Sequence, residues 1–454
     1  MECKMRDTCK CHHRLVSLLL LFLSMILLQS TCPASLYAMD LMEAYSRARG
    51  HDALFGVAFY EHEAARTLPK QGRAILFPTI QARGSAARIN YDSAPAFYRD
   101  YTSKSMSVNL QQPLFSLPRY HEYRQYKIRG NIGEVRFVSA EQDLLFRVSE
   151  AYFNVLAAGN LLDLIDVEKK AIEEQGVQAR RMFEAGVTTI TDVHDAEARL
   201  DDVLAGEIEA KNDLDFQIEA FKKIVGTEPA GLDFLKEEVP FGIPGPENLD
   251  AWIEIAKEHH PILKGHAYQI NYQEAELKKN QGQHWPNVDL VAGYYRTNTS
   301  DNRETAQISY GTGGVQINLP IYSGGYTAAK VSESRAVLSQ ARKEYENALA
   351  EIIQKLSEAL LGIRGNMARI DALLVANKSA YTSVISNRKS LLAGVRTTID
   401  VLNAERDLQD VRVRLLQARY DCLMNMLKLK ASAGTFSGED LLRINSWLQT
   451  ADAN

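Results

Sequence analysis

Hydrophobic and polar residues alternate strictly between positions 105 and 112. Met106, Val108 and Leu110 share one face of this stretch, and serine, asparagine and glutamine side chains share the other. A period of two residues is typical of a β-strand with one apolar and one polar side. Similar alternation elsewhere predicts four strands in all, of which the first is the weakest: 79–89, 105–112, 288–294 and 315–319.

Prolines mark the expected ends of the strands, at Pro113 and Pro118 and again at Pro320. Each strand pair is followed by about 70 residues without another proline, which predicts one continuous helix. From Arg119 to Ala185 such a helix would be roughly 100 Å long, far beyond a typical globular helix. Its own domain cannot bury it, so we expect it to pack against other helices.

A shorter helix returns after each long one. Its apolar residues recur at spacings of three and four, with small residues among them, which is typical of coiled-coil packing. The two seams are Val193, Ala196, Leu200, Val203, Leu214, Ile218, Phe221 and Val225, and Val401, Ala404, Leu408, Val411, Cys422, Met426, Leu429 and Ala433. Before the first strand, residues 41–76 predict an amphipathic helix with a break at Gly50.

The chain is duplicated. Residues 184–200 match residues 392–408, 208 positions later, and both copies have a glycine, then Thr-x-x-Asp, then apolar residues at helical spacing. This pattern predicts a corner between two helices. Because the match extends through nearly the whole chain, we expect five segments: a signal peptide 1–38, a first repeat 39–227, a Pro/Gly-rich linker 228–248, a second repeat 249–435 and a C-terminal segment 436–454.

The first 38 residues are typical of an export signal. Four basic residues precede the apolar run 15–28, and Ala34 or Ala38 offers a cleavage site. A lipidated Cys32 is disfavoured, because the preceding leucine stands one place too far away. Cleavage would leave Cys422 as the one remaining cysteine, which excludes a disulfide within one mature chain.

Composition adds exclusions rather than a function. The 454 residues are 46% hydrophobic, which rules out wholesale disorder, and their formal charge of −5 becomes −7 when the signal's four basic and two acidic residues are removed. A mildly acidic exported protein is a poor candidate for binding nucleic acid. No later apolar stretch reaches the roughly 18 residues of a membrane-spanning helix.

We find no pattern typical of a catalytic, metal or cofactor site. His259, His260 and His266 lack zinc-ligand spacing and are expected on a helix. The glycine-rich stretches 311–314 and 323–325 lack the Lys-Ser/Thr of a phosphate-binding loop, so they are interpreted as turns. No cofactor is therefore expected.

Strands with one apolar and one polar side suit a membrane barrel with lipid outside and water inside. Four strands cannot close a barrel, and open edges in lipid would leave backbone groups unpaired. Other subunits would have to complete the sheet. The alternative is a soluble sandwich of two hairpins that caps a coiled coil. The polar segments within each strand pair, 90–100 and 297–307, are expected to be loops.

Taken together, the sequence resembles the TolC family of outer-membrane efflux and type I secretion channels over residues 39–450. No single motif is very specific to this family, but the order of the motifs, the repeat and the signal peptide are specific in combination. The stretches that carry the resemblance are Asp40-Leu-Met-Glu-Ala-Tyr-Ser-Arg-Ala-Arg49, Ala151-Tyr-Phe-Asn-Val-Leu156, Ala185-Gly-Val187, Thr191-Asp-Val193, Asn318-Leu-Pro-Ile-Tyr-Ser-Gly-Gly325, Gly394-Val-Arg-Thr-Thr-Ile-Asp-Val-Leu402 and Ala418-Arg-Tyr420.

The resemblance implies an α+β membrane protein: a homotrimer with one twelve-stranded barrel in the outer membrane and a long helical tunnel in the periplasm. It also implies an exit duct that works with a periplasmic adaptor (membrane-fusion) protein and an inner-membrane transporter or secretion ATPase. Drugs and secreted polypeptides are both possible cargo. A soluble periplasmic coiled-coil adaptor and an exported enzyme on a helical scaffold are the two rival interpretations.

The resemblance further implies that the corners with Gly186 and Gly394 form a gate. In the family an Arg in the second corner bonds to a Thr-Asp pair in the first, here Arg396 with Thr191 and Asp192. A tyrosine that supports this latch in the family is replaced by Leu391, which puts the second tie in doubt.

The family's acidic constriction ring corresponds to Asp400 and Asn403, and three copies of Asp400 would favour cations. Because Asn403 is an aspartate in some relatives, we expect weaker block by multivalent cations. From the residues alone, Thr189-x-x-Asp192 and Thr397-x-x-Asp400 are better explained as capping boxes that start helices. Capping and gating are compatible.

Four aromatic residues recur where strands meet helices: Phe77, Trp285, Phe115 and Tyr322. They would suit an aromatic girdle at the inner membrane interface. Ordinary packing at the bend is the alternative.

Overall fold

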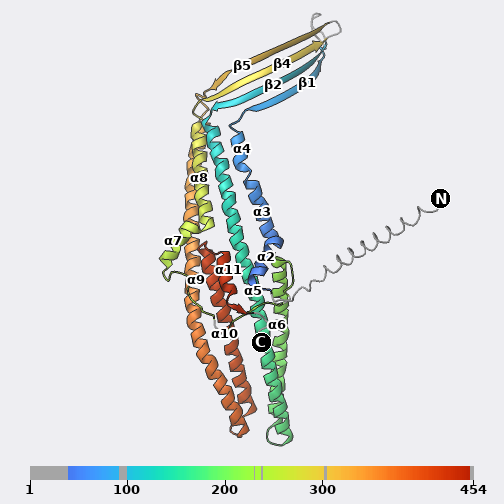
Figure 1. The fold of residues 1–454 in the computed structure, drawn as a ribbon, viewed down its shortest axis with the longest axis vertical. Helices are drawn as coiled ribbons and strands as arrows, with labels where there is room; N and C mark the ends of the chain where they lie inside the picture. The colour runs from blue at the N-terminus through green and yellow to red at the C-terminus, as the bar shows by residue number, and fades with distance from the viewer. Residues whose placement is uncertain (1–38, 92–99, 230, 237–238, 301–303, 450–454) are drawn as a thin grey trace, which may run out of the picture.

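The computed structural model describes residues 39–91, 100–229, 231–236, 239–300 and 304–449. The expected signal peptide, with its cleavage site and Cys32, lies outside these residues. A four-stranded sheet occupies one end of an elongated molecule, and long helices run from it to two hairpin tips at the other end (Figure 1). The architecture is α+β, with most described residues in helices.

Two continuous helices set the length of the molecule. Helix α5 (Leu117–Glu184) has 68 residues and α9 (Tyr326–Leu392) has 67, so each is roughly 100 Å long. The prediction of one unbroken helix from Arg119 to Ala185 is confirmed to within two residues. Helix α5 starts where the Ser116 side chain accepts the backbone N–H of Arg119.

Shorter helices lie beside the long ones. In the first half they are α2 (Leu41–His51), α3 (Ala53–Ala65), α4 (Leu68–Ala74) and α6 (Ile190–Val225); in the second they are α7 (Leu249–His259), α8 (Pro261–Gly282) and α10 (Thr398–Ser432). The expected break at Gly50 is wrong by two positions. It falls at Asp52, whose extended backbone and side-chain carboxylate cap α3 by accepting the backbone N–H of Phe55. Among the described residues, no helix has both the length and the apolar character to cross a membrane.

The sheet is antiparallel in the order β1-β2-β4-β5. Its strands are β1 (Thr79–Ile89), β2 (Tyr101–Phe115), β4 (Asn287–Ser300) and β5 (Thr305–Asn318). All four predicted strands are present, but the loop expected at 297–307 is wrong, because β4 and β5 remain paired up to Ser300 and Thr305. The polar residues there include threonines, which suit strands. Strand β2 also continues through Pro113, with a register shift between Pro113 and Phe115.

The helices form a layer whose two edges continue the two edges of the sheet. In the half next to the sheet the order across the layer is α3 and α4, then α5, α8 and α9; towards the tips it is α6, α5, α10 and α9. Strand β1 follows α4 and β5 leads to α9, so each sheet edge meets a helix edge (Figure 1). Close approach of α4 to α5 depends on Gly130, where a Cβ would lie 2.9 Å from Pro69.

A hydrophobic core lies at mid-length, where Tyr152, Phe153, Phe221 and Phe436 are almost fully buried. The connector between the halves contributes β3 (Phe234–Leu235), which pairs with β6 (Leu448–Gln449) beyond the C-terminal helix α11 (Gly438–Asn445). The connector and the C-terminal segment therefore pack on the same core.

The two halves differ at one buried helix start. In the first, Asp52 accepts two hydrogen bonds from Arg147, at 2.8 and 3.1 Å, and this partner lowers the pKa of the Asp52 carboxyl. At the positions 208 later stand His260 and Lys355. His260 is 8% exposed, and its Nδ1 accepts the backbone N–H of Ile262 to cap α8. Burial, with the nearby Lys355 charge, lowers the pKa of His260 to about 4.

We therefore expect acid to weaken the second half. The pKa of the His260 imidazole falls from about 6.5 in the unfolded chain to about 4 in the folded chain. Its contribution to the free energy of unfolding, about 3 kcal/mol, is therefore fully present above pH 6.5 and is lost as the pH falls through 4. His260→Asn should keep the cap and flatten the pH dependence of the thermal midpoint between pH 6.5 and 4. His259→Asn, which changes an exposed neighbour, should leave that dependence unchanged; equal profiles for all three proteins would contradict the assignment.

Candidate gate at the helical tips

Both hairpin tips turn at a glycine. Gly186 and Gly394 have φ angles of 71° and 72°, a left-handed conformation that side chains disfavour. The backbone N–H after each glycine reaches back to the preceding helix, Val187 to Met182 and Val395 to Ser390. This is a Schellman-type ending. Each long helix thus ends two positions before a glycine, at which the chain reverses direction.

The helices that return from the tips start with capping boxes. In α6 the Asp192 carboxylate accepts from both the backbone N–H and the hydroxyl of Thr189, at 3.1 and 2.9 Å. In α10 Asp400 accepts from the same groups of Thr397, both at 2.9 Å. The capping interpretation is confirmed at both sites. It accounts for the two aspartates without a partner chain.

Asp192 has an additional donor. The hydroxyl of Thr188 also bonds to its carboxylate, and this bond is the main reason why the pKa of Asp192 lies below its usual value. At the equivalent place, just before α10, stands Arg396, whose Nη1 lies 3.4 Å from Asp400 Oδ1. The hydrogen bonds of Thr397, with the Arg396 charge, lower the pKa of Asp400 as well. Both carboxylates are therefore ionised at neutral pH.

The predicted latch residues are not joined within one chain. Arg396 pairs with Asp400, and in the described part of the chain no hydrogen bond or ion pair links it to Thr191 or Asp192. The Arg396 side chain is 56% exposed, so its bond to Asp400 is weak and exchangeable. Leu391 is buried in the last turn of α9, and Asn403 is exposed one helical turn beyond Asp400.

Sequence reasoning missed a repeated ion pair just above the tips. Arg180 bonds to Glu197 at 2.6 Å between α5 and α6, and Arg388 bonds to Glu405 at 2.6 Å between α9 and α10. The members of the two pairs lie 208 positions apart, so the duplication was the signal that could have found them. The Glu405 side chain is only 10% exposed, whereas that of Glu197 is 47% exposed.

The four aromatic residues at the other end do not form a core within the chain. Phe77, Phe115, Trp285 and Tyr322 lie where helices join the sheet, and they are 63%, 43%, 55% and 86% exposed. Packing within one subunit therefore does not explain them.

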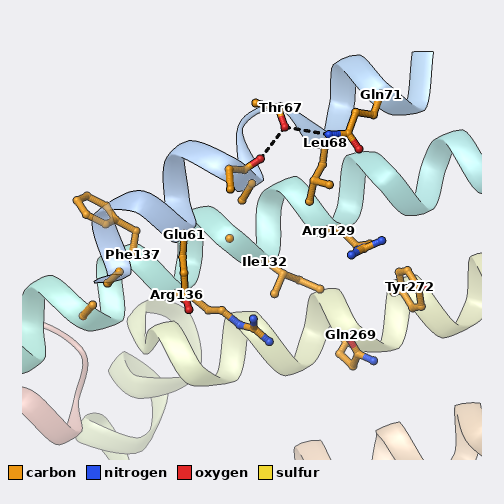
Figure 2. Close-up of a pocket in the computed structure, with 15 residues that line it drawn as sticks. Glu61, Thr67, Leu68, Gln71, Arg129, Ile132, Arg136, Phe137, Gln269 and Tyr272 are labelled. Carbon is orange, nitrogen blue, oxygen red and sulfur yellow. Dashed lines mark hydrogen bonds between the residues drawn. The ribbon is translucent and has the colours of Figure 1, made fainter. Parts of the chain in front are cut away.

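A groove of about 970 Å³ lies between α3, α4, α5 and α8. Figure 2 shows Arg129, Arg136 and Tyr272 along it, with the hydrogen bond between Thr67 and Gln71 at its margin. The lining has no acid or nucleophile paired with a base. Within the described residues, no cluster of His, Cys, Asp or Glu could hold a metal ion.

A layer of long helices with a four-stranded sheet at one end and two hairpin tips at the other suits a subunit of an export channel, and sequence comparison agrees with that class. The family model "Outer membrane efflux protein" matches residues 44–227 and again 252–435. The chain belongs to this family, whose members are channels rather than enzymes, and it is located in the outer membrane.

Similar proteins support this placement. The alkaline protease secretion protein AprF of Pseudomonas aeruginosa is 29% identical over 415 residues, which cover 89% of this chain and 86% of AprF. The outer membrane protein TolC of Vibrio cholerae is 28% identical, covering 96% of this chain and 99% of its own. The crystal structure of outer membrane protein VceC from Vibrio cholerae shares the fold, with a TM-score of 0.75, 17% identity, and coverage of 87% and 96%.

The repeated ion pairs provide a matched test. Arg388→Met leaves the nearly buried Glu405 carboxylate without its partner, so we expect a loss of about 2 kcal/mol and faster amide exchange at the α9–α10 tip. Arg180→Met acts on an exposed pair and should change exchange at the α5–α6 tip very little. Adding Glu405→Gln to Arg388→Met should recover most of the loss. Equal effects at the two tips would contradict the role of burial.

Proposed function

We propose that three copies of this chain form an outer-membrane exit duct that is closed at its helical tips and opened by partner proteins. The observation that carries the proposal is the coincidence of open sheet edges with open helix edges. Strands β1 and β5 each pair on one side only. In lipid an unpaired strand edge costs several kcal/mol per backbone group, so both edges need strands from other subunits.

The helix edges carry matching apolar surface. On one edge α3 exposes Leu54, Val57 and Tyr60, and α6 exposes Ile208 and Phe216. On the other edge α9 exposes apolar side chains along its length: Leu361, Leu374, Val375, Tyr381 and Leu392. Exposed apolar stripes on both sides of one helical layer are typical of subunit interfaces. The same side-by-side contact would close the sheet and the tunnel together.

The size of the lumen sets a lower limit on the number of copies. Two copies would give eight strands, and the interior of an eight-stranded barrel is filled by side chains. Three copies give twelve strands, which leaves room for an aqueous passage. This agrees with the homotrimer that the family resemblance implies.

At the tips we propose that the closed trimer brings Arg396 to Thr191 and Asp192, in exchange for its weak bond to Asp400. Asp192 is already ionised and held in place by its capping bonds, so it would be a ready partner for a cation. Asp400 and Asn403 would then form the constriction. The duct would be recruited by a periplasmic adaptor and an inner-membrane transporter or secretion ATPase.

Secreted polypeptide is the cargo that the comparisons favour, because AprF is named for the secretion of alkaline protease. The efflux of small molecules is the second candidate, because the matching family model is named for efflux.

Planar bilayers test the duct and the latch together. The purified protein should form small, mostly closed pores, and Arg396→Ser should raise their conductance because the tips lose a tie. Arg414→Ser is the matched control, since Arg414 makes the same kind of exposed i,i+4 pair, with Asp410, farther along α10. A monomeric mass without conductance would exclude the duct, and equal conductance of the two variants would exclude the latch.

A further inference from the structure

The strand register sorts the side chains of the sheet onto two faces. Val108 pairs with Tyr294 and Leu110 with Ala292 on the apolar face, whereas Ser107 pairs with Tyr295 and Asn109 with Gly293 on the polar face. Three basic residues nevertheless share the apolar face: Arg88 of β1, Lys104 of β2 and Arg296 of β4. Acidic residues are absent from this face of the four described strands.

By the strand register, all three basic residues lie in the half of the sheet farther from the helices. Arg296 lies eight positions beyond Val288 along β4, and Val288 pairs with Phe115 at the helix end of the sheet. Arg88 is level with Thr102 and Ser300, and Ser300 lies twelve positions beyond Val288. At about 3.3 Å per residue and a tilt of about 40°, these rows stand roughly 20 to 30 Å above the helix end. They therefore bracket the upper margin of an apolar band about 25 Å tall.

Among the described residues, no carboxylate neutralises the positive charges of these three side chains. Arg296 donates to the Gln307 amide oxygen at 3.0 Å, and Arg88 donates to Asn90 at 3.3 Å. Lys104 has no hydrogen-bond or ion-pair partner among the described residues, and none of the three meets a carboxylate there. Basic side chains facing lipid are tolerated near an interface, where an anionic headgroup can serve as the counterion.

We propose that Arg88, Lys104 and Arg296 form a binding site for the phosphate groups of a glycolipid in the outer leaflet. The inference rests on the proposed function, which places the apolar face in lipid and the far end of the sheet at the cell exterior. Two phosphates on one headgroup match cations that are spread diagonally over three neighbouring strands. Arg83, on the polar face of β1 level with Ser107 and Tyr295, faces the lumen and belongs to no such site.

Lipid retention tests the site. The full-length protein is placed in phosphatidylcholine nanodiscs to which lipid A, phosphatidylglycerol or inorganic phosphate is added, and bound lipid is counted by native mass spectrometry alongside the thermal midpoint. We expect lipid A to raise the midpoint, and Arg88→Gln/Lys104→Gln/Arg296→Gln to weaken its binding roughly a hundredfold. Lys104→Gln alone should weaken it less, and Arg83→Gln should bind as the unchanged protein does.

Three outcomes overturn the proposal: undiminished lipid A binding by the triple variant, an equal loss in Arg83→Gln, or an equal response to phosphatidylglycerol or free phosphate. Bilayer conductance of the same preparations separates this site from the duct. If the unsubstituted protein and the triple variant both form pores and bind lipid A equally, the lipid site alone is refuted. If the unsubstituted protein forms no pores, the proposed function and the site are refuted together.

Discussion

Unpaired backbone groups on β1 and β5 are the constraint on which the rest of the molecule depends. A sheet whose apolar face is suited to lipid cannot leave those groups without partners in a medium that offers no water. The edges of the helical layer are also unsatisfied, because α9 on one edge and α3 and α6 on the other expose apolar side chains. One lateral contact between copies would resolve both, so the geometry that closes the barrel also closes the tunnel.

Contacts within one chain account for most of the structure of the tips. Each tip has a left-handed glycine, a Schellman-type ending, a capping box and an ion pair between the two helices, and all of these are satisfied inside one chain. Arg396 is held weakly, by one exposed pair with Asp400. In the proposed gate, such a residue would exchange partners without disturbing the capped helix starts around it.

Sequence patterns predicted the regular elements well, because period and proline placement act locally. The 68 residues of α5 and the four strands follow directly from them. The errors lie where tertiary pairing outweighs local preference. Residues 297–300 and 305–307 look like a loop but are held by the β4–β5 ladder, and Pro113 is accommodated by a bulge. The capping boxes were predictable from the sequence. The partner of Arg396 was not, because sequence spacing points to Asp400, four positions later, but cannot exclude Asp192 on the other hairpin.

The middle of the sheet has a consequence for the joint between copies. By the duplication, β4 corresponds to β1 and β5 to β2, so the β2–β4 pairing joins the second strand of one repeat to the first strand of the next. A β5–β1 contact between neighbouring copies would be the same joint, and α9 beside α3 would likewise repeat α5 beside α8. A single chain therefore already displays a template for its own subunit interface. The ring of three would be a pseudo-hexamer of half-chains. Its joints would alternate between those within one chain, whose two halves are covalently linked, and those between neighbouring chains.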